Sequence, residues 1–227
     1  MILNIETSTS ACSLSLQDEE QLLASINFFL TKSHSTLLPS AIGQLLDQVD
    51  IRKDQLTAIG ISEGPGSYTG LRIGSSTAKA LAFGLDIPVI AVGSLDSMVE
   101  QLPEGFLNSE DVLLPMIDAR RMEIYVRIFN HQKNPLSEVY SQIVDENAFA
   151  EHSGKRLIMF GDGAKKVFEH INFERKVYLD NILPAASGMT RLVYEKFKNK
   201  DFVDVAYFEP LYVKDFQTKK SKDLLRP

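Results

Sequence analysis

The stretch at residues 63–74 reads EGPGSYTGLRIG and separates a strand-like run from a helix-like run. Apolar residues precede it at 58–61, as in a buried strand, and a helical pattern follows it to about Gly84. Three glycines and one proline lie within residues 64–70, which indicates a tight turn with close approach of another backbone. The stretch therefore predicts a strand, a tight loop and a helix in succession.

The helix expected after this loop carries a stripe of small side chains. Gly70, Gly74, Ala78 and Ala82 recur at every fourth position, so they share one helical face. The lack of bulk on that face allows another helix or a ligand to approach closely. We predict a contact surface there; the alternative is packing against the protein's own sheet, with the two glycines serving only the turn.

The composition limits the class of protein. The chain has 227 residues, of which 44% are hydrophobic and 24% charged, enough for one large or two small folded domains. A formal charge of −6 disfavours binding of RNA by phosphate neutralisation alone, so contact with RNA would need a basic partner. A single cysteine, Cys12, cannot form an internal disulfide. Without a leader-like start or a bilayer-spanning apolar stretch, we expect a cytoplasmic protein with no membrane contact.

Apolar periodicity predicts the remaining elements of the first hundred residues. Strands are expected near residues 2–5, 12–16, 24–30 and 88–92, with helices near 37–49 and from about residue 94. Together with the strand and helix around the opening stretch, these elements have the order βββαβαβα.

The second half of the chain begins in the same way. Strands are expected near residues 112–118, 122–128, 139–143 and 157–160, and helices near 146–151, after 164 and near 187–197. Glu6 and Asp118 end the first strand of each half, which indicates a duplicated architecture. The expected divisions are a first lobe at 1–102, a less regular second lobe at 111–213 and a solvated basic tail at 214–227.

Residue spacing disfavours a metal centre and a nucleophilic site. Of the four histidines, His34, His131, His152 and His170, no two stand three or four residues apart, and there is no Cys/His cluster. Ser67 lies on a strand-to-helix turn, but the pattern is not G-x-S-x-G and no histidine is placed beside it. We therefore predict neither a metal site nor a catalytic residue.

Acidic residues at strand ends keep nucleotide binding open. The polar turns that follow them could hold magnesium and phosphates, and a later glycine-containing loop could cradle another group through its N–H groups. No G-x-x-x-x-G-K-[ST] or G-x-G-x-x-G loop is present, so plain hairpin turns are the competing interpretation. The candidate residues are Glu6, Thr7, Asp118, Gly161, Asp162 and Gly163.

Five segments together resemble the bacterial TsaB (YeaZ) family. They are residues 2–8, 12–16, 34–39, 64–74 and 118–125; beyond these, only 161–164 and 210–212 match, and loosely. The resemblance implies an α/β fold of the actin-like ATPase class (ASKHA, ribonuclease H-like) with two duplicated βββαβα-type lobes. It also implies a role in forming threonylcarbamoyladenosine in tRNA.

In this family the chain would be the non-catalytic partner of TsaD, a related subunit that holds the metal and the active site. TsaD would transfer a threonylcarbamoyl group from its adenylate to N6 of the adenosine beside the anticodon, with the ATPase TsaE assisting turnover. TsaD-like proteins bind metal through a histidine pair on one helix, whereas here Leu38 stands four residues after His34. No cofactor is implied, ATP or ADP is expected only at an interface of the complex, and tRNA is contacted mainly through the complex.

The pairing surface of the family, carried over to this chain, lies on the two helices of the first lobe. It would bind TsaD or a second copy of this chain. The residues are His34, Leu37, Leu38, Ala41, Leu45, Leu71, Gly74, Ser75, Ala78 and Ala82. One departure is Glu6, where the family commonly has Asp, and the longer side chain disfavours a magnesium-holding role.

Two other functions stay open. The first is an active ASKHA-type ATPase or phosphotransferase that uses Glu6, Asp118 and the loop at 161–163, although a phosphate-loop glycine is missing after the first strand. The second is a metallopeptidase, a label that relatives in this superfamily have carried, and the absent ligand pair disfavours it.

Overall fold

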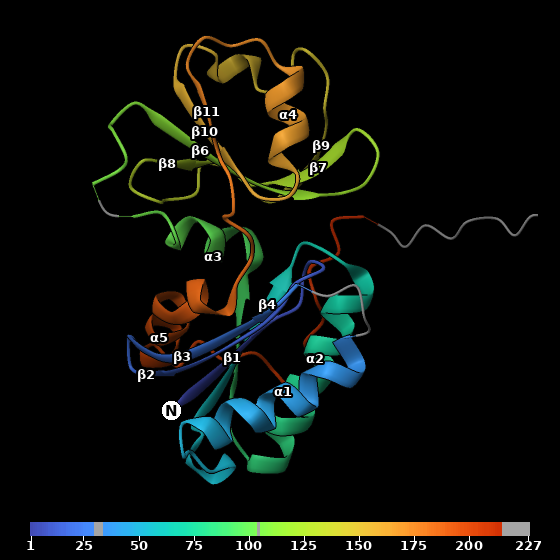
Figure 1. Cartoon of the computed structure of the whole chain (residues 1–227), viewed down its shortest axis with the longest axis vertical. Helices are drawn as coiled ribbons and strands as arrows, with labels where there is room; N and C mark the ends of the chain where they lie inside the picture. The colour runs from blue at the N-terminus through green and yellow to red at the C-terminus, as the bar shows by residue number, and fades with distance from the viewer. Residues whose placement is uncertain (30–33, 104, 215–227) are drawn as a thin grey trace, which may run out of the picture.

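The computed structural model describes residues 1–29, 34–103 and 105–214, with the side chain of residue 34 outside the described part. Figure 1 shows two lobes stacked along the long axis of the molecule. Each lobe is built on one mixed β-sheet. No helix within the described ranges combines the length and the apolar character that a membrane crossing needs.

The first sheet has the strand order β3-β2-β1-β4-β5. Its strands are β1 (Ile2–Glu6), β2 (Cys12–Asp18), β3 (Gln21–Phe28), β4 (Ala58–Gly64) and β5 (Val89–Gly93). The first three pair antiparallel, whereas β4 pairs parallel with both β1 and β5. Side chains alternate along β1, so Leu3 and Ile5 enter one hydrophobic cluster and Ile2 enters another on the opposite face.

Two helices, α1 (His34–Gln48) and α2 (Tyr68–Leu85), cover one face of this sheet, and a short 3-10 helix, η1 (Lys53–Gln55), precedes β4. The caps of α2 explain where this helix begins and ends. The hydroxyl of Ser67 accepts a hydrogen bond from the backbone N–H of Gly70 at 3.2 Å, and Asp86 adopts a left-handed conformation after the last turn.

The second sheet has the order β11-β10-β6-β7-β9. Its strands are β6 (Asp111–Asp118), β7 (Glu123–Val126), β9 (Tyr140–Ile143), β10 (Arg156–Phe160) and β11 (Lys176–Leu179), and a short β8 (Phe129–Asn130) also pairs with β6. Counted from β9, the strands follow the same order and directions as in the first sheet. The predicted α/β fold with two duplicated ASKHA-type lobes is therefore confirmed.

The second lobe lacks one helix that the sequence pattern predicted. Residues 146–149 form turns, and only a short 3-10 helix, η2 (Ala150–His152), follows them. Phe149 is buried and has a left-handed backbone (φ 64°), which an α-helix cannot continue through. The helix predicted near 146–151 is wrong for this reason, whereas α4 (Ala164–His170) follows β10 as expected.

Each half of the chain contributes a helix to the lobe formed mainly by the other half. The helix α3 (Ser94–Glu100) belongs to the first segment but packs Leu95 and Met98 against the second sheet. Conversely, η3 (Ala186–Met189) and α5 (Thr190–Lys198) cover the free face of the first sheet, where Val193 joins the cluster around Ile90. The segments 1–102 and 111–213 therefore do not coincide with two packing units, because each lobe is completed by a helix from the other (Figure 1).

Candidate functional site

A cleft of about 800 Å³ lies between the lobes at the carboxyl ends of β1, β4 and β6. Its walls are the turn after β1 (8–10), the loop from β4 into α2 (65–69), the end of β6 (117–121) and the segment 211–214. Ligands of open α/β sheets bind outside the carboxyl ends of the strands, so this cleft is the place where a small molecule would bind.

Glu6 and Thr7 lie beneath this cleft and not in its wall, because both side chains are fully buried. One carboxylate oxygen of Glu6 accepts a hydrogen bond from the backbone N–H of Ser8 at 2.6 Å, and the other has no hydrogen-bond partner among the described residues. Burial raises the pKa of the Glu6 carboxyl, and nearby serine hydroxyls oppose this only in part. A buried acid of this kind favours the neutral form and is poorly suited to hold a cation.

Asp118 occupies the matching position in the second lobe and lines the cleft. Its Oδ1 accepts hydrogen bonds from the Lys166 ammonium at 2.6 Å and from the backbone N–H of Arg120 at 2.7 Å. The backbone N–H of Asp118 in turn donates to Asp162 Oδ1 at 2.9 Å. These two aspartates are therefore the members of the predicted nucleotide set that reach the cleft.

The glycines of the loop after β10 contact the protein's own strand. A Cβ on Gly161, whose φ is +104°, would lie 2.1 Å from the carbonyl oxygen of Met116. The backbone N–H of Gly163 donates to the same oxygen at 3.2 Å. The N–H of Gly163 is thus used by β6, which leaves this loop fewer donors for a ligand than the sequence interpretation allowed.

The small-residue face of α2 points inward. A Cβ on Gly70 would lie 2.1 Å from the Thr7 carbonyl oxygen, and one on Gly74 would lie 2.3 Å from Thr7 Oγ1. Farther along the helix, Ala78 and Ala82 are buried in the hydrophobic core of the first lobe. The stripe therefore lets α2 approach the turn after β1, which is the alternative that the sequence left open.

Burial excludes most of the predicted pairing residues from an interface of the folded chain. Leu37 is half-buried, and the side chain of His34 lies outside the described part. The other eight are buried within the chain: Leu38, Ala41, Leu45, Leu71, Gly74, Ser75, Ala78 and Ala82. This part of the predicted interface is wrong, because apolar periodicity locates the buried face of a helix and not its outward face.

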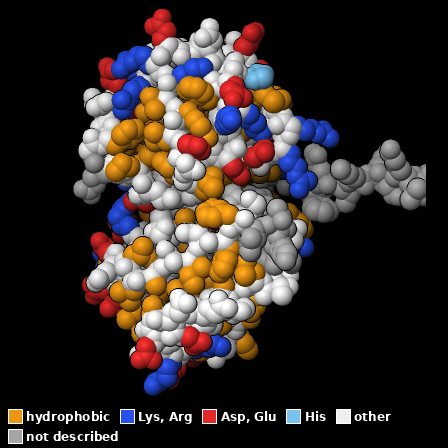
Figure 2. All heavy atoms as spheres, in the orientation of Figure 1, with side chains coloured by type: hydrophobic (Ala, Val, Ile, Leu, Met, Phe, Trp, Pro, Cys, Tyr) orange, Lys and Arg blue, Asp and Glu red, His pale blue; other side chains and the backbone are white. Residues whose placement is uncertain are grey.

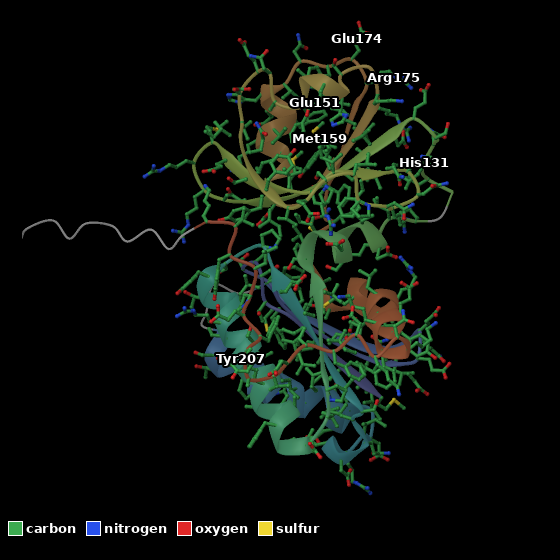
Figure 3. All side chains as sticks on the ribbon, turned by 180° about the vertical axis from the view of Figure 1, so that it is seen from behind. His131, Glu151, Met159, Glu174, Arg175 and Tyr207 are labelled. Carbon is green, nitrogen blue, oxygen red and sulfur yellow. The ribbon has the colours of Figure 1, made fainter. Side chains whose placement is uncertain are left out.

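The outward face of α2 presents Arg72, Ser76, Ala80 and Phe83 to solvent. Phe83 is 88% exposed, and Tyr207, which lies beside α2 (Figure 3), is 84% exposed. Exposed aromatic side chains such as these are typical of protein–protein contact sites. On the opposite side of the molecule, shown in Figure 2, few charged side chains occupy the middle of the first lobe, whereas the second lobe carries many.

Sequence reasoning missed the lysine that binds Asp118 and the segment that closes one side of the cleft. Lys166 stands 48 residues from Asp118, and no spacing rule connects a strand end to a side chain on a later helix. The segment 211–214 was included in the second lobe and the basic tail, yet it lines the cleft between the lobes. The loose match at residues 210–212 was the one signal in that region.

The comparisons with known proteins agree with this architecture. The family model described as TsaD, tRNA N6-adenosine threonylcarbamoyltransferase, matches residues 29–162. The chain is 36% identical over 146 residues to the tRNA threonylcarbamoyladenosine biosynthesis protein TsaB of Bacillus subtilis, an alignment that covers 64% of this chain and 61% of that protein.

Two further comparisons extend over nearly the whole chain. The TsaB protein of Haemophilus influenzae is 27% identical, with 96% of this chain and 95% of that protein covered. The solved structure of YeaZ from Pseudomonas aeruginosa matches with a TM-score of 0.76 and 25% identity, covering 93% of this chain and 98% of that one. The chain belongs to the TsaD family and, within it, to the TsaB (YeaZ) group, as the resemblance of its motifs predicted.

Proposed function

We propose that this chain is the non-catalytic partner of TsaD in the complex that modifies tRNA to threonylcarbamoyladenosine. The observation that carries this proposal is the similarity to curated TsaB proteins over almost the whole chain, 96% in one case. In the proposed reaction TsaD transfers the threonylcarbamoyl group to N6 of the adenosine beside the anticodon. TsaE then assists turnover, and tRNA is contacted mainly through the assembled complex.

The chemistry of the strand-end acids supports a non-catalytic role. Glu6 is buried and its ionised form is disfavoured, so it is a poor ligand for a magnesium ion that carries phosphates. Asp118 is held by Lys166 and by a backbone N–H, which compete with a cation for the same oxygen. Both features fit a cleft that has kept its architecture without the groups that phosphoryl transfer requires.

The second candidate function is an ASKHA-type ATPase, and the size and position of the cleft favour it. A binding experiment on the isolated chain distinguishes the two functions. The non-catalytic proposal expects calorimetry to detect no ATP or ADP binding by this chain alone and to detect binding only with TsaD present. Hydrolysis of ATP by the isolated chain that Asp118→Ala abolishes would favour the ATPase instead.

We place the TsaD-binding surface on the outward faces of α1 and α2 and not on their buried stripes. Phe83 offers an aromatic anchor, and the small side chains of Ser76 and Ala80 leave room for a neighbouring helix. TsaD belongs to the same family as this chain, so a related subunit could present a matching helix pair. A second copy of this chain could use the same surface when TsaD is absent.

Substitutions on this surface test the proposal. Ala80→Arg adds a long charged side chain at an exposed site, so the chain should fold normally while binding to TsaD weakens at least tenfold, equivalent to about 1.4 kcal/mol. Leu136→Arg, at an exposed apolar position of the second lobe, is the matched control and should bind as the unmodified chain does. Titration calorimetry measures the affinity, and mass spectrometry of digested tRNA measures threonylcarbamoyladenosine in the reconstituted reaction.

Two results would contradict this assignment. Normal affinity of both Ala80→Arg and Phe83→Ala for TsaD would place the interface elsewhere on the molecule. Full tRNA modification by TsaD and TsaE of the same organism without this chain would remove the proposed role altogether.

A further inference from the structure

The last described segment of the chain runs alongside α2 before it reaches the cleft. Val203 forms a bridge with Val89 at the edge of the first sheet, and its N–H donates to the Val89 carbonyl at 2.9 Å. The Lys79 ammonium then reaches the carbonyl oxygen of Ala206 at 3.4 Å. In Figure 1 this segment, coloured red, continues from the first lobe towards the level of the second.

Residues 211 and 212 anchor the segment to the first lobe. The N–H of Leu211 donates to the carbonyl oxygen of Glu63 at 2.7 Å. The ring of Tyr212 lies 4.9 Å from that of Tyr68, between centroids. The Arg72 guanidinium stands 4.2 Å over the Tyr68 ring, and its Nε donates to the Tyr212 hydroxyl at 3.3 Å. The segment is therefore held on the first lobe by a backbone hydrogen bond and by ring contacts that include a cation–π interaction.

Lys214 anchors the same segment to the second lobe. Its ammonium forms an ion pair with Glu123 on β7, and both side chains are only about a quarter exposed. The ammonium also stands 5.9 Å from the ring centroid of Tyr125. The contact with Lys214 is the main reason that the pKa of the Glu123 carboxyl is lowered. A single residue, Val213, therefore separates the anchor on one lobe from the anchor on the other.

We propose that residues 211–214 form a strap that ties the two lobes together along one wall of the cleft. Because the strap is short and held at both ends, it limits how far the lobes can separate. Arg72 links the strap to the outward face of α2, where its side chain is exposed. In this proposal TsaD presents a carboxylate that binds this guanidinium more strongly than the neutral Tyr212 hydroxyl does, and binding of TsaD at α2 thereby loosens the strap. This last step rests on the proposed function.

Hydrogen exchange at the Leu211 amide, followed by NMR, tests the strap in the isolated chain. Lys214→Ala and Arg72→Ala each remove one anchor, so exchange should become about fivefold faster, equivalent to about 1 kcal/mol. Lys165→Ala, at an exposed lysine on α4, is the matched control and should leave the rate unchanged. Circular dichroism establishes that every variant is folded. Unchanged exchange in both anchor variants overturns the strap.

Spin labels at Lys53→Cys and Glu169→Cys, both exposed, measure the separation of the lobes directly. The native Cys12 is buried and its thiol has a pKa of about 11, so it does not compete for the label. A single narrow distance is expected in the labelled chain and a broader, longer distribution after Lys214→Ala. Identical distributions in the two proteins would contradict a restraint on the lobes.

Addition of TsaD tests the link to α2. Faster exchange at Leu211 in the TsaD-bound chain supports release of the strap, whereas equal or slower exchange in the bound state overturns it. Failure of TsaD to bind at all contradicts the proposed function and leaves the results with Lys214→Ala and Arg72→Ala standing, so the two failures are distinguishable.

Discussion

The turns that follow β1 and β6 occupy equivalent places in two sheets of identical strand order, yet their acids have opposite surroundings. Glu6 is fully buried and its carboxyl pKa is raised by burial. Asp118 is 46% exposed at its side chain and pairs with Lys166. A duplicated topology thus repeats the position of an acid without repeating its chemistry.

The helix that follows each parallel strand explains the difference. In the first lobe, α2 is long, and its glycines let it press on the turn after β1. In the second lobe, α4 is shorter, and β6 is joined to β7 by a hairpin turn in which Arg120 and Arg121 both have left-handed backbones. That turn stands open to the cleft, so its acid is solvated and can recruit a lysine.

Close contact between α2 and the turn after β1 should contribute strongly to stability. Gly70→Ala places a Cβ 2.1 Å from a backbone carbonyl oxygen that cannot move aside, so it should lower the free energy of unfolding by about 3 kcal/mol. Gly43→Ala on α1 is the control, because open space surrounds that site and alanine favours helix by about 0.5–1 kcal/mol. Urea unfolding measures both, and equal stability of the two variants would refute the close contact.

Gly163, which precedes α4 in the second lobe, should have a smaller effect. Gly163→Ala brings a Cβ to 2.9 Å from a side-chain methyl of Ile124 and 3.0 Å from the backbone of Ile117. These neighbours can yield in part, so a loss of about 2 kcal/mol is expected in the same urea experiment. A loss greater than that of Gly70→Ala would reverse the comparison between the two lobes.

The buried acid should make stability depend on pH. Because its pKa is raised from 4.5, folded Glu6 binds more protons than unfolded Glu6 does, and the free energy of unfolding falls as pH rises above 4.5. Glu6→Gln removes this pH-dependent loss of stability. The variant and the unmodified chain should therefore have equal free energies of unfolding near pH 4, and the variant should have the larger value at pH 7. Thermal unfolding across that range checks the prediction, and parallel pH profiles would show that the acid does not titrate in this way.

The exposed acid should matter least for stability. Asp118→Asn weakens a partly exposed pair with Lys166, so unfolding in urea should change by less than about 1 kcal/mol. The change in the free energy of unfolding caused by Asp118→Asn should become still smaller at high ionic strength, because salt screens the ion pair. Urea unfolding at several salt concentrations measures this. A loss as large as that of Gly70→Ala would mean that the fold depends on this acid, and would contradict its assignment as a solvated group.

Most of the strands were predictable because alternation and short apolar runs are local properties. The pattern at residues 12–16 and the loop at 63–74 led to β2 and to the start of α2. The helix near 146–151 was mispredicted because Phe149, an ordinary apolar residue in the sequence, adopts a left-handed backbone in the fold. No local signal marks that conformation.

The candidate sites were harder to predict than the fold. Gly74 and Ala78 were correctly placed on one face of α2, but the direction of that face depends on the turn after β1, more than 60 residues earlier. The pair formed by Lys166 and Asp118, and the strap that joins Lys214 to Glu123, bring together residues from distant elements. Such contacts depend on how the two sheets are placed relative to one another, and no residue spacing in the sequence predicts them.

Local pattern was sufficient for the order of strands and helices in residues 2–100 and indicated the duplication, because backbone preference and side-chain periodicity act over a few neighbouring residues. In the second half it missed β11 and predicted a helix near 146–151 that does not form, and the family followed from the resemblance of the motifs. Three-dimensional packing decided that Glu6 is buried, that the small face of α2 points inward and that α3 and α5 exchange lobes. Burial is set by what covers a side chain, and here the covering elements come from remote parts of the chain.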